Sequence, residues 1–251
     1  MTRPLAATAL ALLLAAAPVR AAPTGSTPVE VTWDRELAQD HDRDHYEQEL
    51  LAIVEACHAL AARELDLPAD RRLKVAVLTP AGYARRFGAA ASESRGAHYQ
   101  GGTIFVNGGR RLDDRFAGLM AHEMAHAVLD DRGAGGRLPV WLNEGLAERI
   151  RWRRQRLDDL TPDQKTQLQY DGRERRLVPL LSAGDGSFDY LHVYAATLCL
   201  EKAVGRAALL EVVHRTVRGE RFEKALDRVT RLTPVDLERR FVDWVEHLPI
   251  P

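Results

Sequence analysis

The sequence predicts an α+β protein with a small mixed sheet near the N-terminus and a mainly helical C-terminal part. Two observations indicate this class: the strand-like segments lie before residue 110, and helical periodicity extends through most of the chain after it. Strands early and helices late favour α+β over repeating βαβ units, in which the two alternate. With 45% hydrophobic and 28% charged residues, the 251-residue chain has an ordinary globular composition, which excludes a wholly disordered protein.

The N-terminal segment, residues 1–21, has the layout of a secretory signal peptide. Arg3 supplies a positive charge, residues 5–17 are an almost unbroken apolar run, and Pro18 ends that run before a cleavage site at 19–21. The run is too short to cross about 30 Å of hydrocarbon, and an uncleaved anchor is the alternative. We therefore expect export, to the periplasm or as a secreted protein, and no stable membrane insertion after the signal is removed.

The rest of the chain divides into a leader and one domain. Residues 22–39 begin with a Pro/Thr/Ser-rich stretch, and we expect a loose leader there. A single domain is expected over 40–251, beginning with a helix from Asp40 to about Leu65, where apolar residues recur at helical spacing. Pro68 then ends this helix.

Two strand regions follow that helix. LKVAVLTP at 73–80 is a β-branched run closed by proline, which is typical of a buried strand. Residues 81–95 indicate a short helix and a loop. Residues 97–109 predict paired strands, with Gly101 and Gly102 as the turn between them.

Helices are expected through the remainder. A strong helix over 113–131 begins with two aspartates, which suit the positive N-terminal end of a helix, and stops at the glycines of 133–136. A second helix is predicted over 138–150. We expect a polar excursion of helix and loop over 151–176 and a helical subdomain over 189–248.

The charge balance excludes one class of partner. Lys and Arg total 35 against 36 for Asp and Glu, a formal net charge of −1. Such a chain has no overall positive field to hold a polyanion, so we expect no nucleic-acid partner.

The two cysteines leave one question open. Cys57 and Cys199 permit a single disulfide in an oxidising compartment. Both also lie in apolar stretches, where free thiols pack as small hydrophobic side chains. The sequence does not decide between these states.

The motif HEMAH, from His122 to His126, is the strongest chemical signal. On a helix, residues four apart share one face, so both imidazoles can reach one metal ion at about 2.0–2.1 Å. Glu123 is rotated about 100° from His122 and lies beside such an ion, where it can accept a proton from a water that the ion activates. The motif thus predicts one Zn²⁺ per chain, with the two histidines as ligands and Glu123 as general base.

Two glutamates on the next predicted helix complete the expected site. A catalytic zinc takes three protein ligands and keeps one position open, and Glu144 in WLNEGLAE is the expected third ligand. Glu148 is one helical turn further on, where its carboxylate can accept the free N–H of a ligand histidine. The alternative is that both belong to an exposed polar stripe.

These segments resemble the gluzincin metallopeptidases. HEMAHAVL followed by LPVWLNEGLAE is most similar to the peptidase MA-like family of bacterial proteins, and the similarity extends over roughly residues 72–248. The resemblance implies a zincin-like fold with an active-site helix, a single zinc, and peptide-bond hydrolysis. By motif match it assigns His122, His126 and Glu144 as ligands and Glu123 as general base. A Gly-x-Met-Glu-Asn-type stretch before HEMAH is missing, which argues against the aminopeptidase branch.

The resemblance also suggests a group that stabilises the oxyanion. Gluzincins often use a Tyr or His from a helix downstream of the third ligand, and Tyr194 lies where the family places a tyrosine. Tyr190 and His192 are nearby alternatives. Tyr194 is equally consistent with an ordinary core aromatic residue.

The sequence therefore predicts an exported zinc-dependent peptidase that acts on peptides or unfolded proteins. We expect the substrate to lie along the strand at 103–106, with its scissile carbonyl near the metal. The alternative is a catalytically silent binding module that keeps the fold and holds a partner protein or peptide.

Overall fold

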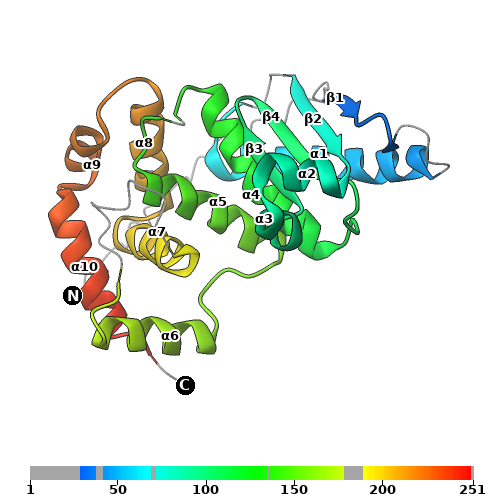
Figure 1. Ribbon diagram of the computed structural model, residues 1–251. Coiled ribbons are helices and arrows are strands. Elements are labelled where there is room, and N and C mark those ends of the chain that lie inside the picture. Colours follow the sequence, from blue (N-terminus) through cyan, green and yellow to red (C-terminus); the bar gives the residue numbers. More distant parts are fainter. Residues whose placement is uncertain (1–28, 38–41, 69–71, 135, 178–188, 250–251) are drawn as a thin grey trace, which may run out of the picture.

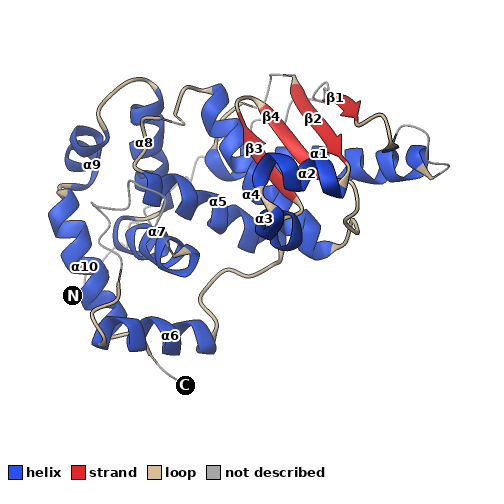
Figure 2. Ribbon diagram, in the orientation of Figure 1, coloured by secondary structure: helices blue, strands red, loops and turns tan. Residues whose placement is uncertain are grey.

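The computed structural model of this protein describes residues 29–37, 42–68, 72–134, 136–177 and 189–249. The predicted α+β class is confirmed: a mixed four-stranded sheet is formed early in the chain, and helices make up most of the described chain that follows (Figures 1 and 2). The predicted signal peptide at 1–21 lies outside the described residues.

The sheet has the strand order β1-β2-β4-β3. Its strands are β1 (Val29–Trp33), β2 (Leu73–Leu78), β3 (Ala97–Gln100) and β4 (Thr103–Asn107). β1 pairs with β2 and β2 with β4 in parallel, whereas β3 and β4 are antiparallel. The expectation of a loose leader over 22–39 is wrong for residues 29–33, because the alternating segment VEVTW adds to β2 as an edge strand.

The β3–β4 hairpin is the predicted pair of strands. Gly101 and Gly102 both have positive φ, at 57° and 79°, as a two-residue hairpin turn requires. The strand at 103–106, along which we expected a substrate, lies inside the sheet between β2 and β3. That expectation is corrected by the topology, because β3 and not β4 has a free side for pairing.

Helices cover both faces of the sheet (Figure 1). The short helices α2 (Pro80–Phe87) and α3 (Ala89–Ser94) lie on one face, where α2 contacts β2 and β4. The helix α4 (Asp114–Asp131) lies against β3 and β4 and packs on α1 (Arg43–Leu65). Alternate residues of β2, such as Val75 and Val77, are buried in the resulting core.

The described residues of the C-terminal part form six helices. Their bounds are α5 (Val140–Arg154), α6 (Pro162–Arg173), α7 (Tyr190–Val204), α8 (Arg206–Val217), α9 (Phe222–Thr230) and α10 (Pro234–Glu246). α6 is the helix of the expected polar excursion, and α7 to α10 match the expected helical stretch over 189–248. None of the helices that the structure describes combines the length and apolar character needed to cross a bilayer. Cys57 and Cys199 are both buried free thiols.

α5 is held between α4 and α7, and Gly145 permits its close approach to α7. A Cβ atom added at Gly145 would lie 2.0 Å from Thr197 Oγ1 and 2.5 Å from the Val193 carbonyl oxygen. Only a residue without a side chain fits this contact. The packing fixes the position of the residue before it, Glu144.

We predict that Gly145→Ala lowers the free energy of unfolding by about 3 kcal/mol, because the added methyl group must push α7 away from α5. Urea denaturation followed by circular dichroism measures the change. The matched control is Gly136→Ala, since a Cβ at Gly136 meets no atom within 4 Å. Equal stability of the Gly145→Ala protein and the wild type would contradict this account of the packing.

Candidate metal centre

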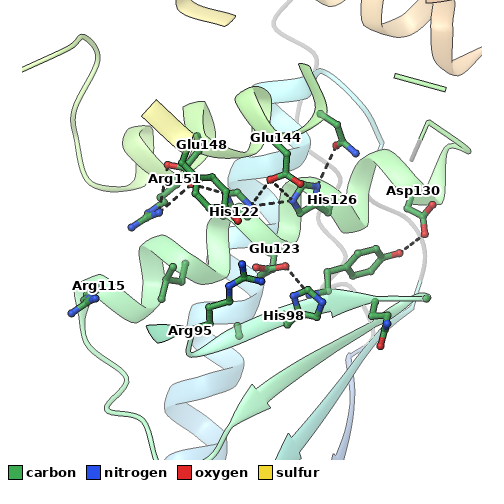
Figure 3. A pocket seen from close by; sticks show the side chains of 17 residues that line it. Arg95, His98, Arg115, His122, Glu123, His126, Asp130, Glu144, Glu148 and Arg151 are labelled. Atoms are coloured by element: carbon green, nitrogen blue, oxygen red, sulfur yellow. Dashed lines mark hydrogen bonds and ion pairs between the residues drawn. The ribbon is translucent and has the colours of Figure 1, made fainter. Parts of the chain in front are cut away.

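Three of the predicted site residues, contributed by α4 and α5, converge on one point. His122 Nε2 and His126 Nε2 are 3.0 Å apart, and Glu144 Oε2 lies 3.4 Å from the former and 3.6 Å from the latter. The two histidines lie one turn apart on the same face of α4, and Glu144 faces them from the first turns of α5 (Figure 3). The three residues form a group that can hold a metal ion.

The spacing of the three donor atoms fits a small tetrahedral cation. With bond lengths of 2.0–2.2 Å, ligand atoms around Zn²⁺ lie about 3.4 Å apart, which the three measured separations bracket. Glu144 Oε2 is buried and meets no hydrogen-bonding geometry with any described donor. A buried carboxylate oxygen without a donor is costly unless a cation compensates it, so the residues present fit a metal site.

Each ligand histidine is oriented through its other ring nitrogen. His122 Nδ1 lies 2.9 Å from Glu148 Oε1, and His126 Nδ1 lies 3.2 Å from Asn143 Oδ1. An oxygen acceptor at Nδ1 places the hydrogen there and leaves the lone pair of Nε2 directed at the common point. Both imidazoles are therefore arranged as metal ligands.

The carboxylate of Glu148 is itself held in place. Arg151 Nη1 donates to its Oε1 at 3.1 Å, and Trp152 Nε1 donates to its Oε2 at 3.2 Å. Burial raises the pKa of Glu148, but the neighbouring His122 and Arg151 lower it further, so the net pKa lies below its usual range. Glu148 is thus an ionised, fixed acceptor for His122.

The electrostatics of the group favour positive charge at its centre. Burial disfavours the charged imidazole, yet the carboxylates of Glu144 and Glu148 raise the pKa of His122 to about 10. Burial likewise opposes ionisation of Glu144, but the two imidazoles hold its pKa well below the usual range. Both directions show that positive charge is favoured beside these carboxylates, and a divalent cation at this point would supply it.

Glu123 lies beside the convergence point and not on it. Its side chain is buried, lines the same cavity, and accepts a hydrogen bond from the backbone N–H of Tyr99 at 2.6 Å. Tyr99 belongs to the edge strand β3, so Glu123 links the face of α4 that carries His122 to the edge of the sheet. This is the side-on position expected from its 100° rotation relative to His122.

The structure places the three candidate oxyanion residues in different surroundings. Tyr190 lines the cavity, and its ring centroid is 5.8 Å from that of His122. Tyr194, one turn further along α7, is 1% exposed and stacks on Trp152 in the core. His192 is also buried and pairs with Asp171 at 3.0 Å. Of the three, only Tyr190 is brought to the metal group.

A cavity of about 770 Å³ lies over the group, between β3 and the two ligand helices (Figure 3). The floor of the cavity contains His122, His126 and Glu144 together with Glu123 and Glu148, and β3 forms one wall. Its other polar and charged lining residues are Arg95, His98, Tyr99, Gln100, Arg115, Asp130, Asn143, Arg151 and Tyr190. The cavity is large enough for a segment of extended peptide rather than a single water.

Two groups that position site residues, the Asn143 side chain and the Tyr99 N–H, were not predicted from the sequence. Asn143 orients His126, and its place directly before the expected ligand Glu144 was the available signal. The backbone N–H of Tyr99 has no sequence signature, because a donor from the main chain is independent of side-chain type.

The chain stands apart in comparisons with known proteins. No family model matches it, and no curated protein and no solved structure matches it.

We predict that the purified protein binds one zinc ion and that Glu148→Gln weakens zinc binding about 10- to 100-fold, because a neutral amide orients His122 less firmly. Competition with a chromophoric chelator measures the affinity. The control is Glu246→Gln, which removes an exposed carboxylate at the end of α10. Unchanged affinity in the Glu148→Gln protein would show that the 2.9 Å contact does not support the ligand.

Proposed function

We propose that this protein is a zinc-dependent peptidase. The observation that carries the proposal is the convergence of His122 Nε2, His126 Nε2 and Glu144 Oε2 beneath an open cavity, with the Glu123 carboxylate at its side. Three protein ligands leave a position free for solvent and substrate, whereas structural zinc sites usually close it with a fourth side chain. The similarity of HEMAHAVL and LPVWLNEGLAE to gluzincin peptidases supports the same assignment.

Each residue of the site has a separate role in the proposed hydrolysis. A zinc ion in this group would lower the pKa of a bound water and polarise a carbonyl oxygen. Glu123, held by the Tyr99 N–H, is positioned to accept the proton of the attacking water and to pass it to the leaving amine. Tyr190, whose ring centroid is 5.8 Å from that of His122, would donate its hydroxyl hydrogen to the oxyanion. Burial and the nearby Glu144 raise the pKa of Tyr190, which keeps that hydrogen in place.

The edge strand provides a means of holding an extended substrate. β3 lines the cavity and has β4 on one side only, so its outer side can pair with a peptide backbone. Main-chain pairing of this kind accepts many sequences, which suits peptides and unfolded proteins as substrates. We also propose that the enzyme acts outside the cytoplasm, in the periplasm or as a secreted protein, because of the signal-like segment at 1–21.

We predict that Glu123→Gln retains one equivalent of zinc but loses at least about 1,000-fold in the rate of casein hydrolysis, because the amide cannot accept the proton. Zinc content by elemental analysis and proteolysis by fluorescence release test the two halves separately. A chelator should abolish wild-type activity and zinc should restore it. Metal-dependent melting with no turnover by the wild type would instead support the binding-module alternative.

We predict that Tyr190→Phe lowers kcat about 100-fold while KM changes less than twofold, because the lost hydroxyl serves the transition state and not substrate binding. The matched control is Tyr194→Phe, on the same helix but outside the cavity, which should leave kcat within twofold of the wild type. The reverse result, with the loss in Tyr194→Phe, would place the oxyanion donor on the other tyrosine.

A further inference from the structure

The carboxylates and the arginines that line the cavity differ in their contacts. Each carboxylate has a near polar partner in the cavity: Glu144 has the imidazoles, Glu148 has Arg151, Glu123 has the Tyr99 N–H, and Asp130 accepts from the Tyr99 hydroxyl at 2.6 Å. The three arginines of the lining differ from one another in their contacts. Arg151 forms an ion pair with Glu148, but the side chains of Arg95 and Arg115 make no hydrogen bond or ion pair with any described residue.

These two arginines enter the cavity from neighbouring segments. Arg95 directly follows α3, two residues before β3, and Arg115 is in the first turn of α4 (Figure 3). Their neighbours in the chain touch: a Cβ atom at Gly96 would lie 2.9 Å from the ring of Phe116. Both side chains are exposed, and both line the cavity. Two guanidinium groups of the lining are therefore available to a substrate group that enters the cavity.

We propose that Arg95 and Arg115 form a subsite for a carboxylate of the substrate, on the C-terminal side of the cleaved bond. The proposal rests on the proposed peptidase function and deepens it by naming the preferred substrates as acidic peptides. Guanidinium groups are suited to carboxylates, which they bind through paired hydrogen bonds. The chain direction of the bound peptide follows from that of β3, which runs from the Arg95 end toward Gly101. A peptide that pairs antiparallel, the more stable arrangement, has its C-terminal part at the arginine end.

The distance between Arg115 and His122 predicts which substrate residue carries the favoured carboxylate. Arg115 precedes His122 by two helical turns, which is about 10 Å along the axis of α4. An extended peptide advances about 3.3 Å per residue, so this distance corresponds to about three residues. The favoured carboxylate therefore belongs to the second or third residue after the cleaved bond. A Glu or Asp side chain at that position would supply this carboxylate, and so would the free C-terminus of a peptide that ends there.

The test uses internally quenched peptides with one cleavable bond and the zinc-loaded protein. One series moves a single Glu through the first four positions after the bond, with Gln as the neutral partner at each. A second series ends at the third position as a free acid or as an amide, which separates the side-chain source from the terminal source. We expect Glu at the second or third position to raise kcat/KM about fivefold over Gln, as exposed ion pairs do.

The variants assign the effect to the two residues. Arg95→Gln and Arg115→Gln should each remove most of the Glu preference, the double variant all of it, and the preference should fall with added salt. Arg111→Gln is the matched control, an exposed arginine four residues before Arg115 that does not line the cavity. A Glu preference that persists in the double variant, or none in the wild type, overturns the proposal.

A binding measurement separates this proposal from the peptidase function. Fluorescence anisotropy with zinc-loaded Glu123→Gln protein reports peptide affinity without turnover. Tighter binding of the Glu peptide than the Gln peptide, lost in the triple variant with Arg95→Gln and Arg115→Gln, supports the subsite even if the wild type cleaves nothing. Equal binding of the two peptides by a wild type that does cleave them removes the subsite and leaves the peptidase standing.

Discussion

The packing of α5 between α4 and α7 is the contact on which the rest of the site depends. The two histidines are fixed relative to each other by one helical turn, but the third ligand comes from a different helix, so its distance is set by tertiary packing alone. Gly145 allows α5 to meet α7 closely, and the side chains on either side of that contact, Glu144 and Glu148, both reach His122. The same contact holds α7, whose first residue Tyr190 lies against the metal group. One backbone-to-backbone approach thus determines ligand, orienting group and candidate oxyanion donor together.

The buried carboxylates around the metal group are held by specific contacts. Glu148 is bound by His122, Arg151 and Trp152, and Glu123 is bound by the edge strand. Glu144 Oε2 has no hydrogen-bond donor, and a positive charge at the point where the ligand atoms meet would compensate it. Basic residues elsewhere on α5 follow the same rule: Arg149 binds Glu201, and Arg153 binds Asp158. Several arginines of this helix are therefore held in ion pairs within the chain.

The sequence was informative where local spacing determines structure. The i, i+4 interval of His122 and His126, the two-glycine turn, and the proline and glycine boundaries of the helices depend on nearby residues, and the structure has them where they were expected. It was less informative where structure depends on distant partners. Residues 29–33 become a strand only because β2 is available beside them, and β4 is interior only because β1 and β3 take the outer places. Tyr190 and Tyr194 lie on one helix with the same chemistry, and only the packing of Trp152 against the latter separates them.

The hydrogen bond between Glu123 and the Tyr99 N–H gives the edge strand a second role. In β3, residues whose backbone groups hydrogen-bond to β4 alternate with residues whose backbone groups face away from β4. Tyr99 is one of the latter, and its N–H faces Glu123. A guest strand that docks there needs the same hydrogen that the carboxylate now holds. In the proposed peptidase, a docked backbone and the Glu123 carboxylate would compete for this single donor, so docking on β3 would separate Glu123 from the sheet.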